Sequence, residues 1–316
     1  MKTYELASYI TLFSFSSTLL INSLLIYLTI RKIQLIHGPY KWMIVLFAFI
    51  GILLSFVEVT FQPCIHNFNA AFMFFSLNEY LPNWLLSFGI ACYGGFISVI
   101  LTFVAMQFLF RCWTLSNDPW TTSFQGVRVL LWVAFVLTPS VCYVILTYLL
   151  ISPEEFTDGY MEKEILEVYN LKIADAPRFI MVAYNNQDFD IRWRNSLFVA
   201  STCSIVTMSF ITITYCALRM RREMKTCMKK LSQRNLRLET QFFKALLAQS
   251  AFPTFLLVLP TGPVVFLPFL DLQVSLQSGF LFSIFSFYPP IDSIAMMVII
   301  TEYKVHIKSE SSRIVS

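Results

Sequence analysis

Seven long apolar stretches, separated by shorter polar segments, make up most of the chain. They lie at about 8–30, 42–63, 84–110, 128–151, 196–218, 243–270 and 278–300. Each stretch is long enough to cross the hydrocarbon core of a bilayer, roughly 30 Å thick, as an α-helix. The pattern therefore predicts an all-α membrane protein, a seven-transmembrane helix bundle formed by residues 1–300, with a short tail at 301–316.

The seventh stretch, 278–300, combines an interrupted backbone with a single charge. Its sequence is SGFLFSIFSFYPPIDSIAMMVII, in which Asp292 is the charged residue and lies just after Pro289 and Pro290. Proline lacks an N–H and clashes with the preceding turn, so the pair is expected to bend the helix. A bent helix with a buried carboxylate can adopt more than one packing arrangement. This combination is typical of a conformational switch rather than a passive anchor.

Glycines and prolines distinguish two further stretches. In the third stretch, Gly94 and Gly95 let neighbouring helices approach closely, which suits the central helix of a bundle. The sixth stretch contains four prolines: Pro253, Pro260, Pro263 and Pro268. Broken backbone is not tolerated against lipid, so this helix is predicted to bend and to line a cavity.

Composition agrees with a membrane protein, and the charge distribution predicts its topology. Of the 316 residues, 57% are hydrophobic and 13% are charged, which is about half the charged fraction of a soluble domain. Most of the 23 Lys and Arg residues lie in alternate segments, at 31–41, 111–128, 219–244 and 301–316. The positive-inside rule places these segments in the cytoplasm, with the N-terminus outside and the C-terminus inside. The net charge of +4 therefore reflects topology and does not suggest nucleic acid as a partner.

Several kinds of chemistry have no residue pattern to support them. His37, His66 and His306 are far apart in the sequence and form no i, i+4 pair, so neither a metal site nor a cofactor is expected. The chain has no glycine-rich phosphate loop and no nucleophile elbow, and we expect no enzymatic activity. Cys64 is the one cysteine near the predicted outer face, so no intramolecular disulfide is expected there.

Two charged residues near the ends of apolar stretches each have two interpretations. Glu58 lies in the outer third of the second stretch, where it either contributes to a ligand pocket or reaches water at the membrane surface. Arg111 closes the third stretch at the predicted cytoplasmic edge. Its position alone favours a side chain that extends to lipid headgroups.

The long outer segment 152–195 carries a predicted helix start. Ser152 is the expected N-cap, Pro153 the first helical residue and Glu155 the third. The segment is acidic. Its charge is consistent with a solvated surface and also with attraction of a cationic ligand. Its length also suits a lid over a membrane cavity.

The segment 219–244 is the most strongly basic part of the chain. Leu231, Leu238 and Phe242 recur at helical spacing within it, which predicts an amphipathic extension of the sixth helix into the cytoplasm. Such a segment anchors to anionic lipid, and it is also long enough to bind a protein partner.

Six short motifs, in order along nearly the whole chain, resemble the nematode serpentine chemoreceptors of the str class. These are G-protein-coupled receptors that include olfactory members. The motifs are GPYKWM at 38–43, the neighbourhood of Glu58, Pro63 and His66, the run from Tyr93-Gly94-Gly95 to Arg111, EILEVYNLKIADAP at 164–177, FFKALLAQSAFP at 242–253, and YPPIDSIAMMVIITEYK at 288–304.

The resemblance implies roles for residues at the cytoplasmic side and in the seventh stretch. Arg111 would lie at the edge that couples to a heterotrimeric G protein, together with basic residues of the following loops: Arg221, Arg222, Lys229, Lys230 and Arg234. An activation switch would involve Pro253, Tyr288, Pro289, Pro290 and Asp292.

The ligand implied by the resemblance is a small, volatile or weakly polar chemical. Its pocket is expected in the outer half of the bundle, between the second, third, fifth, sixth and seventh helices. The candidates by depth are Glu58, Gln62, Cys92, Tyr93, Thr202, Phe266, Phe282, Phe285 and Tyr288. The implied location is the plasma membrane of a sensory cilium, and the oligomeric state stays open.

A seven-span ligand-gated channel or transporter is the alternative from another class. Its expected marks are rings of polar residues around a pore, or internal repeats. Neither is visible in the sequence, so a receptor is the favoured hypothesis.

Overall fold

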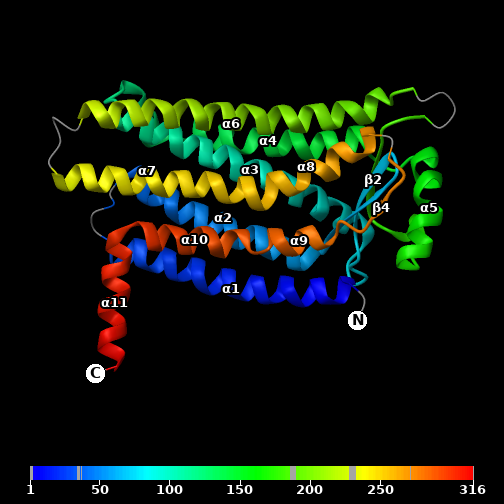
Figure 1. Cartoon of the computed structure of the whole chain (residues 1–316), viewed down its shortest axis with the longest axis horizontal. Helices are drawn as coiled ribbons and strands as arrows, with labels where there is room; N and C mark the ends of the chain where they lie inside the picture. Colours follow the sequence, from blue (N-terminus) through cyan, green and yellow to red (C-terminus); the bar gives the residue numbers. More distant parts are fainter. Residues whose placement is uncertain are drawn as a thin grey trace.

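The computed structural model describes residues 3–33, 36, 38–185, 190–227, 233–270 and 272–315. Long helices run side by side along the long axis of the molecule, and each end of this bundle carries further elements (Figure 1). One end carries a β-sheet and helix α5, and we call it the sheet end. The other end carries the last helix, α11, and we call it the tail end.

Within the described residues, seven helical segments are long and apolar enough to cross a membrane: Ser8–Arg31, Pro39–Phe61, Asn83–Leu115, Gly126–Leu150, Trp193–Thr226, Gln233–Leu270 and Leu281–Ile299. We call them the first to seventh spans. Five of them consist mainly of one continuous helix each: α1 (Thr3–Arg31), α2 (Pro39–Phe61), α3 (Asn83–Leu115), α4 (Val129–Leu150) and α6 (Trp193–Cys227).

Helix α3 is the central helix, as its glycines predict. In its most apolar window 78% of the residues are buried, against 6% in the span that contains α4. A Cβ on Gly94 would lie 2.4 Å from the Tyr143 ring, and one on Gly95 would lie 2.8 Å from Ser140 Oγ. Glycine at these two positions therefore permits the close contact between α3 and α4.

The sixth span bends, as its prolines predict. Helix α7 (Gln233–Pro253) ends at a proline and is followed by a π-helical turn, Thr254–Val258. Helix α8 (Leu259–Phe266) and a 3₁₀ turn (Leu267–Leu270) complete the span. A π turn inserts one extra residue into the helical ladder and changes the direction of the helix, often at a functional site.

The seventh span is broken rather than merely bent. Helix α9 (Phe280–Phe285) stops before the prolines, and α10 (Tyr288–Ile299) restarts with Pro289 and Pro290 in its first turn. Proline is tolerated in the first turn because its missing N–H would have no partner there. The pair therefore acts as a helix start, and the structure has a break between two helices where the sequence predicted a bend in one.

The four-stranded sheet was not predicted from the sequence. Strands β1 (Pro63–Phe68), β2 (Ala71–Ser76), β3 (Arg178–Val182) and β4 (Ser275–Leu276) are antiparallel neighbours in the order β3-β2-β1-β4. They bring together the segments between the second and third, fourth and fifth, and sixth and seventh spans. Asn69 makes the β1–β2 turn with a positive φ of 46°, a conformation that asparagine tolerates well.

The sheet closes the end of the bundle, and its strand β2 is buried on both faces. Phe72 and Phe74 belong to the core of the bundle, whereas Ala71, Met73 and Phe75 pack in a second core with α5 (Glu155–Tyr169). Alternate residues of a strand point to opposite faces, so both cores share β2. Helix α5 and strand β3, both from the long outer segment, thus lie over this end of the bundle together with β1 and β2.

Helix α5 starts two residues later than the expected Ser152 cap. Its N-cap is Glu154, which forms a reciprocal capping box with Thr157. Ser152 instead donates its hydroxyl proton to the carbonyl of Tyr148 at the end of α4. The carboxylate of Glu154 also pairs with Arg192 and Arg194, so this cap is fixed by contacts that are distant in sequence.

Asn67 on the bundle face of β1 connects the sheet to the sixth and seventh spans. Its Nδ2 donates to the carbonyl of Val264 at 2.7 Å, and Ser278 Oγ donates to its Oδ1 at 3.1 Å. The side chain is fully buried. The Asn67 side chain therefore joins β1 to the sheet end of the sixth span and to the residues just before the seventh span.

Candidate functional site

An ion pair joins α3 to α7 near the tail end. Arg111, in the last turns of α3, is 6% exposed, and its Nη2 lies 2.5 Å from Oε2 of Glu239 on α7. The guanidinium carbon lies 4.7 Å from the ring centroid of Tyr40 on α2 and 4.4 Å from that of Phe242 on α7. The arginine is thus held between two aromatic rings and a carboxylate. It does not extend to the surface, so the lipid-headgroup interpretation of Arg111 is wrong.

The sequence identified Arg111 but missed its partner. Glu239 is an acidic residue within the basic segment 219–244, and this contrast of charge was the available signal. Helix α7 begins at Gln233, so the sixth helix does extend beyond its apolar stretch. Phe242 is buried and Leu238 half-buried on that extension, whereas Leu231 lies outside the described residues.

The other basic candidates do not take part in this contact. Arg221, Arg222 and Arg234 are exposed, and Lys229 and Lys230 lie outside the described residues. Exposed cations beside a buried ion pair form a positive surface at the tail end.

Three polar side chains meet in the core between α7 and α10. Gln249 Nε2 donates to Asp292 Oδ2 at 3.3 Å, and both side chains are buried. Within the part of the chain that the structure describes, Asp292 Oδ1, Gln249 Oε1 and the Tyr288 hydroxyl have no hydrogen-bond partner. Buried polar atoms are normally satisfied, so these three atoms are suited to form different contacts in another packing arrangement or to hold water.

Two more hydrogen-bond pairs fix the tail end. Gln241 on α7 donates to Thr301 Oγ1 at 2.7 Å and accepts from the Thr301 N–H at 3.1 Å. The hydroxyls of Thr29 on α1 and Tyr303 on α11 (Thr301–Val315) lie 2.7 Å apart. Burial raises the pKa of Tyr303 to about 12. These contacts join α7 and α1 to the start of α11.

At the sheet end, Glu58 forms a polar contact across the bundle. Its side chain is 2% exposed and accepts a hydrogen bond from Ser286, which lies in the break between α9 and α10. The Tyr93 side chain on α3 interacts with the same carboxylate. The interpretation in which Glu58 reaches water is therefore wrong, because the carboxylate faces the third and seventh spans.

An aromatic cluster surrounds this contact. The Phe282 ring lies against Phe74 of β2 at 6.1 Å between centroids, and 5.4 Å from each of Tyr93 and Phe285. The structure thus brings together Glu58, Tyr93, Phe282 and Phe285 among the predicted ligand residues. The cluster is covered by the sheet.

The remaining ligand candidates have other surroundings. Phe266 is 52% exposed on α8. Thr202 donates to the carbonyl of Phe198 in its own helix, and Cys92 faces Tyr148 of α4. Gln62 caps the end of α2 with a positive φ of 43°.

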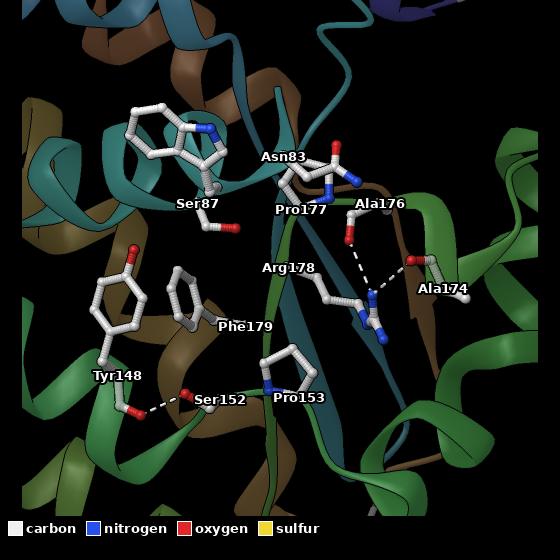
Figure 2. Close-up of a pocket in the computed structure, with 11 residues that line it drawn as sticks. Asn83, Ser87, Tyr148, Ser152, Pro153, Ala174, Ala176, Pro177, Arg178 and Phe179 are labelled. Carbon is white, nitrogen blue, oxygen red and sulfur yellow. Dashed lines mark hydrogen bonds between the residues drawn. The ribbon is translucent and has the colours of Figure 1, made fainter. Parts of the chain in front are cut away.

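A pocket of about 260 Å³ opens at the sheet end between α3, α4 and the loop that leads into β3 (Figure 2). Its lining residues are Asn83, Trp84, Ser87, Tyr148, Ser152, Pro153, Ala174, Ala176, Pro177, Arg178 and Phe179. Tyr148 and Phe179 meet edge to face there, with centroids 5.1 Å apart. We call it the α3–α4 pocket. The pocket could not be predicted from the sequence, because its walls come from three segments of the chain.

The second core contains a hydrogen-bonded histidine. His66 on β1 is fully buried, with Nε2 3.2 Å from Glu164 Oε1 and Nδ1 3.3 Å from the Tyr169 hydroxyl, both on α5. Burial lowers the pKa of His66, and Glu164 opposes this shift. Burial also raises the pKa of the neighbouring Cys64 thiol to about 12. The described residues contain no group of three or more His, Cys, Asp or Glu side chains that could hold a metal.

Comparison with known proteins identifies the family. A model described as "Serpentine type 7TM GPCR chemoreceptor Str" matches residues 7–308. The chain belongs to the Str family of serpentine seven-transmembrane chemoreceptors. A Str relative, "G-protein coupled receptor str-33" of Caenorhabditis elegans, is 36% identical over 95% of this chain and 89% of its own length. "Serpentine receptor class r-10" is 23% identical in C. elegans, over 84% of this chain and 80% of that protein.

A solved structure supports the same architecture for this Str chain. Squid rhodopsin matches 98% of this chain and 81% of its own with a TM-score of 0.56 and 12% sequence identity. At this identity the likeness shows the fold alone. The chain is therefore a multi-pass membrane protein with a rhodopsin-like bundle, in a family of G-protein-coupled receptors.

Proposed function

We propose that this Str protein is an olfactory-type chemoreceptor that binds a small chemical in the outer half of its bundle and activates a heterotrimeric G protein. In this proposal residues 1–300 form one receptor domain and 301–316 a cytoplasmic tail. The sheet end faces outward and the tail end faces the cytoplasm of a chemosensory cilium. The distribution of cations supports this orientation, and the family supports the ligand class and the partner.

The observation that carries the proposal is the buried pair of Arg111 and Glu239. It connects the tail ends of α3 and α7, and this contact supports the proposal that the tail end is a cytoplasmic face in its closed form. A receptor reports a ligand only if the ligand binds one conformation better than the other. Separation of the two helices would expose Arg111 and the cations of the neighbouring loops to an α subunit. Lys229 and Lys230 of that loop, with Arg221, Arg222 and Arg234, would add positive charge to this surface.

The change in packing would take place at the two interrupted spans. Pro253 and the π turn provide one bend, and the break before Pro289 and Pro290 provides the other. Asp292 and Gln249 join the two spans on the tail side of these bends, with acceptor atoms available for another partner. These residues form the proposed activation switch, with Tyr288 one turn before Asp292 on α10.

The cluster of Glu58, Tyr93, Phe282 and Phe285 is the proposed ligand-sensing element. It contacts the second, third and seventh spans and lies directly beside the break at Ser286. A ligand that shifts these rings would change the packing of α9 against α10. Gln62, Cys92, Thr202 and Phe266 stay candidates of lower priority because their contacts lie elsewhere.

The test is ligand-independent nucleotide exchange by a G protein in nanodiscs that contain the full chain. Glu239→Gln removes the charge of the pair while keeping its shape. If it weakens the closed state by about 1.4 kcal/mol, the open fraction rises about tenfold. Glu223→Gln, in the same basic segment, is the control and should leave exchange at the wild-type level. A ligand-gated current in lipid bilayers without G protein, and no exchange by any variant, would favour the channel alternative.

A further inference from the structure

The α3–α4 pocket has walls suited to a flat apolar molecule. Trp84 lies in the first turn of α3. Tyr148 comes from the sheet end of α4 and Phe179 from β3 (Figure 2). Pro153 and Pro177 complete the wall toward the loops. Aromatic rings and prolines offer a large contact area with few rotatable bonds, so little side-chain entropy is lost on binding.

The pocket offers no free charge to a ligand. Among the described residues that line it, Arg178 is the one charged side chain. Its Nε and Nη2 bind the two carboxylate oxygens of Asp158 at 2.7 and 2.5 Å. Its Nη1 donates to the carbonyl of Ala176 at 3.0 Å. A bidentate pair of this kind neutralises the guanidinium, so the pocket selects against both anions and cations.

Its volume sets the size of the occupant. A dry protein cavity of about 150 Å³ holds benzene, which has six non-hydrogen atoms. The volume of about 260 Å³ here therefore accommodates roughly ten such atoms. Ser87 and Tyr148 add hydroxyls that can donate or accept one hydrogen bond.

We propose that the α3–α4 pocket is a ligand-binding site for a small neutral organic molecule with a flat, apolar body of about ten non-hydrogen atoms and one hydrogen-bonding group. The proposal deepens the receptor function and rests on it, because it names a place where the chemical signal enters. The pocket is separate from the cluster of predicted ligand residues, which the sheet covers.

A line of aromatic contacts connects this pocket to the seventh span. Phe179 in the pocket wall is the register partner of Phe74 across the β3–β2 ladder. Phe74 lies against Phe282, and Phe282 contacts Phe285 just before the break at Ser286. An occupant that moves Phe179 would therefore change the packing of α9. Spatial continuity alone does not establish coupling, so the experiment measures binding and signalling separately.

The probes are acetophenone and benzoate, which are similar in size and differ in charge. Full-length protein in phosphatidylcholine nanodiscs is titrated with each probe, and binding is followed by saturation-transfer NMR. We expect saturable acetophenone binding with a Kd of about 1 mM or tighter, and binding of benzoate at least about tenfold weaker. Equal binding of the two probes would overturn the assignment to neutral ligands.

Two variants locate the binding. Ser87→Trp fills the pocket, and Trp84→Ala removes an exposed wall without changing the core, since Trp84 is 72% exposed. Each should weaken acetophenone binding by about tenfold or more. Leu137 of α4 is 47% exposed. Leu137→Trp is the matched control and should bind acetophenone as the wild type does. Wild-type affinity in both pocket variants, or no saturable binding by the wild type, would overturn the proposal.

The source of the ligand and the role of the pocket are tested on the same samples. Binding in detergent that disappears in phosphatidylcholine nanodiscs would show that a lipid chain occupies the pocket, and would overturn the small-molecule assignment. Nucleotide exchange by Glu239→Gln reports the receptor function independently of the pocket. Exchange without pocket binding refutes only this inference, whereas pocket binding without exchange in any variant refutes only the proposed G-protein coupling.

Discussion

Phe74 of β2 lies nearly parallel to Phe282 of α9, with an interplanar angle of 9° and ring centroids 6.1 Å apart. The contact joins a sheet residue to α9, the part of the seventh span that precedes its break. Together with the hydrogen bonds of Asn67, it makes the sheet part of the bundle core rather than a separate cap.

Truncation of Phe74 should therefore affect signalling as well as stability. Phe74→Ala should lower the free energy of unfolding by about 3 kcal/mol or more, because it leaves a cavity. It should also change basal nucleotide exchange, since α9 loses its contact with the sheet. Phe75→Ala is the control because Phe75 is equally buried but faces α5. It should lower the thermal midpoint by a similar amount and leave exchange unchanged, and equal exchange by the two variants would contradict the argument.

Arg111→Ala and Asp292→Ala should each abolish the G-protein response without removing ligand binding. The first removes a cation presented to the G protein and the second removes the contact between α7 and α10. Arg111→Ala should also cost about 1–3 kcal/mol of stability, since the half-buried Glu239 loses its charge-assisted hydrogen bond. Binding, surface expression and exchange are measured on the same cells. A variant that is expressed normally and signals fully would refute the role of that residue.

Glu58→Gln tests the polar contact at the sheet end. The amide can still accept from Ser286, so folding and surface expression should be preserved, whereas one of the two carboxyl oxygens becomes an NH2 group that cannot accept a hydrogen bond from Tyr93. We expect a shift in ligand potency of roughly tenfold, equivalent to about 1.4 kcal/mol. A dose–response curve superimposable on the wild type would limit Glu58 to a packing role.

The orientation predicts which segments are accessible on intact cells. A tag inserted between Ser232 and Gln233 should be stained only after permeabilisation, and one after Gln187 should be stained on intact cells. Both insertions fall at or beside long polar connections, which tolerate insertion. Surface staining of the first tag without permeabilisation would reverse the topology and end the G-protein proposal.

Acid should loosen the contact between α5 and the sheet. Burial holds the pKa of His66 in the folded protein below its ordinary value of 6.5. At a pH between the folded pKa and 6.5, His66 is therefore protonated when α5 and the sheet are unfolded and neutral when they are folded. The stability contributed by the neutral ring is therefore full above about pH 6.5 and is lost as the pH falls through the folded pKa. Hydrogen exchange of α5, corrected for intrinsic rates, should show less protection at about pH 5.5 than at about pH 7.5. His66→Gln should show a smaller difference between the two pH values, because the titrating ring is removed. Glu164 and Tyr169, the other groups that face the ring, are still present in this variant.

The helical spans could be predicted from the sequence because bilayer thickness fixes the length of each apolar stretch. The sheet could not. Residues 71–75, AFMFF, are apolar on both faces, so they lack the alternation that marks a half-buried strand. Their strand conformation depends on β3, which lies more than a hundred residues further along the chain.

The candidate site shows the same division between local and distant information. Arg111 and Asp292 stand out locally, as charges in apolar sequence. Glu239 does not, because its pairing depends on a contact across 128 positions. The α3–α4 pocket is harder to predict, since Trp84, Tyr148 and Phe179 come from three elements that are far apart in the sequence.

The π turn at Thr254–Val258 gives α7 the mechanics of a lever. Glu239 lies fourteen residues before Pro253, or about 21 Å along a helix that rises 1.5 Å per residue. A rotation of about 10° at the turn would carry the Glu239 carboxylate about 4 Å sideways over that arm. The gap of 2.5 Å to Arg111 would then exceed 6 Å if the movement were directed away from α3, roughly beyond the reach of a direct hydrogen bond. A displacement of about 1 Å one turn beyond the pivot is thus amplified roughly fourfold where a G protein would bind.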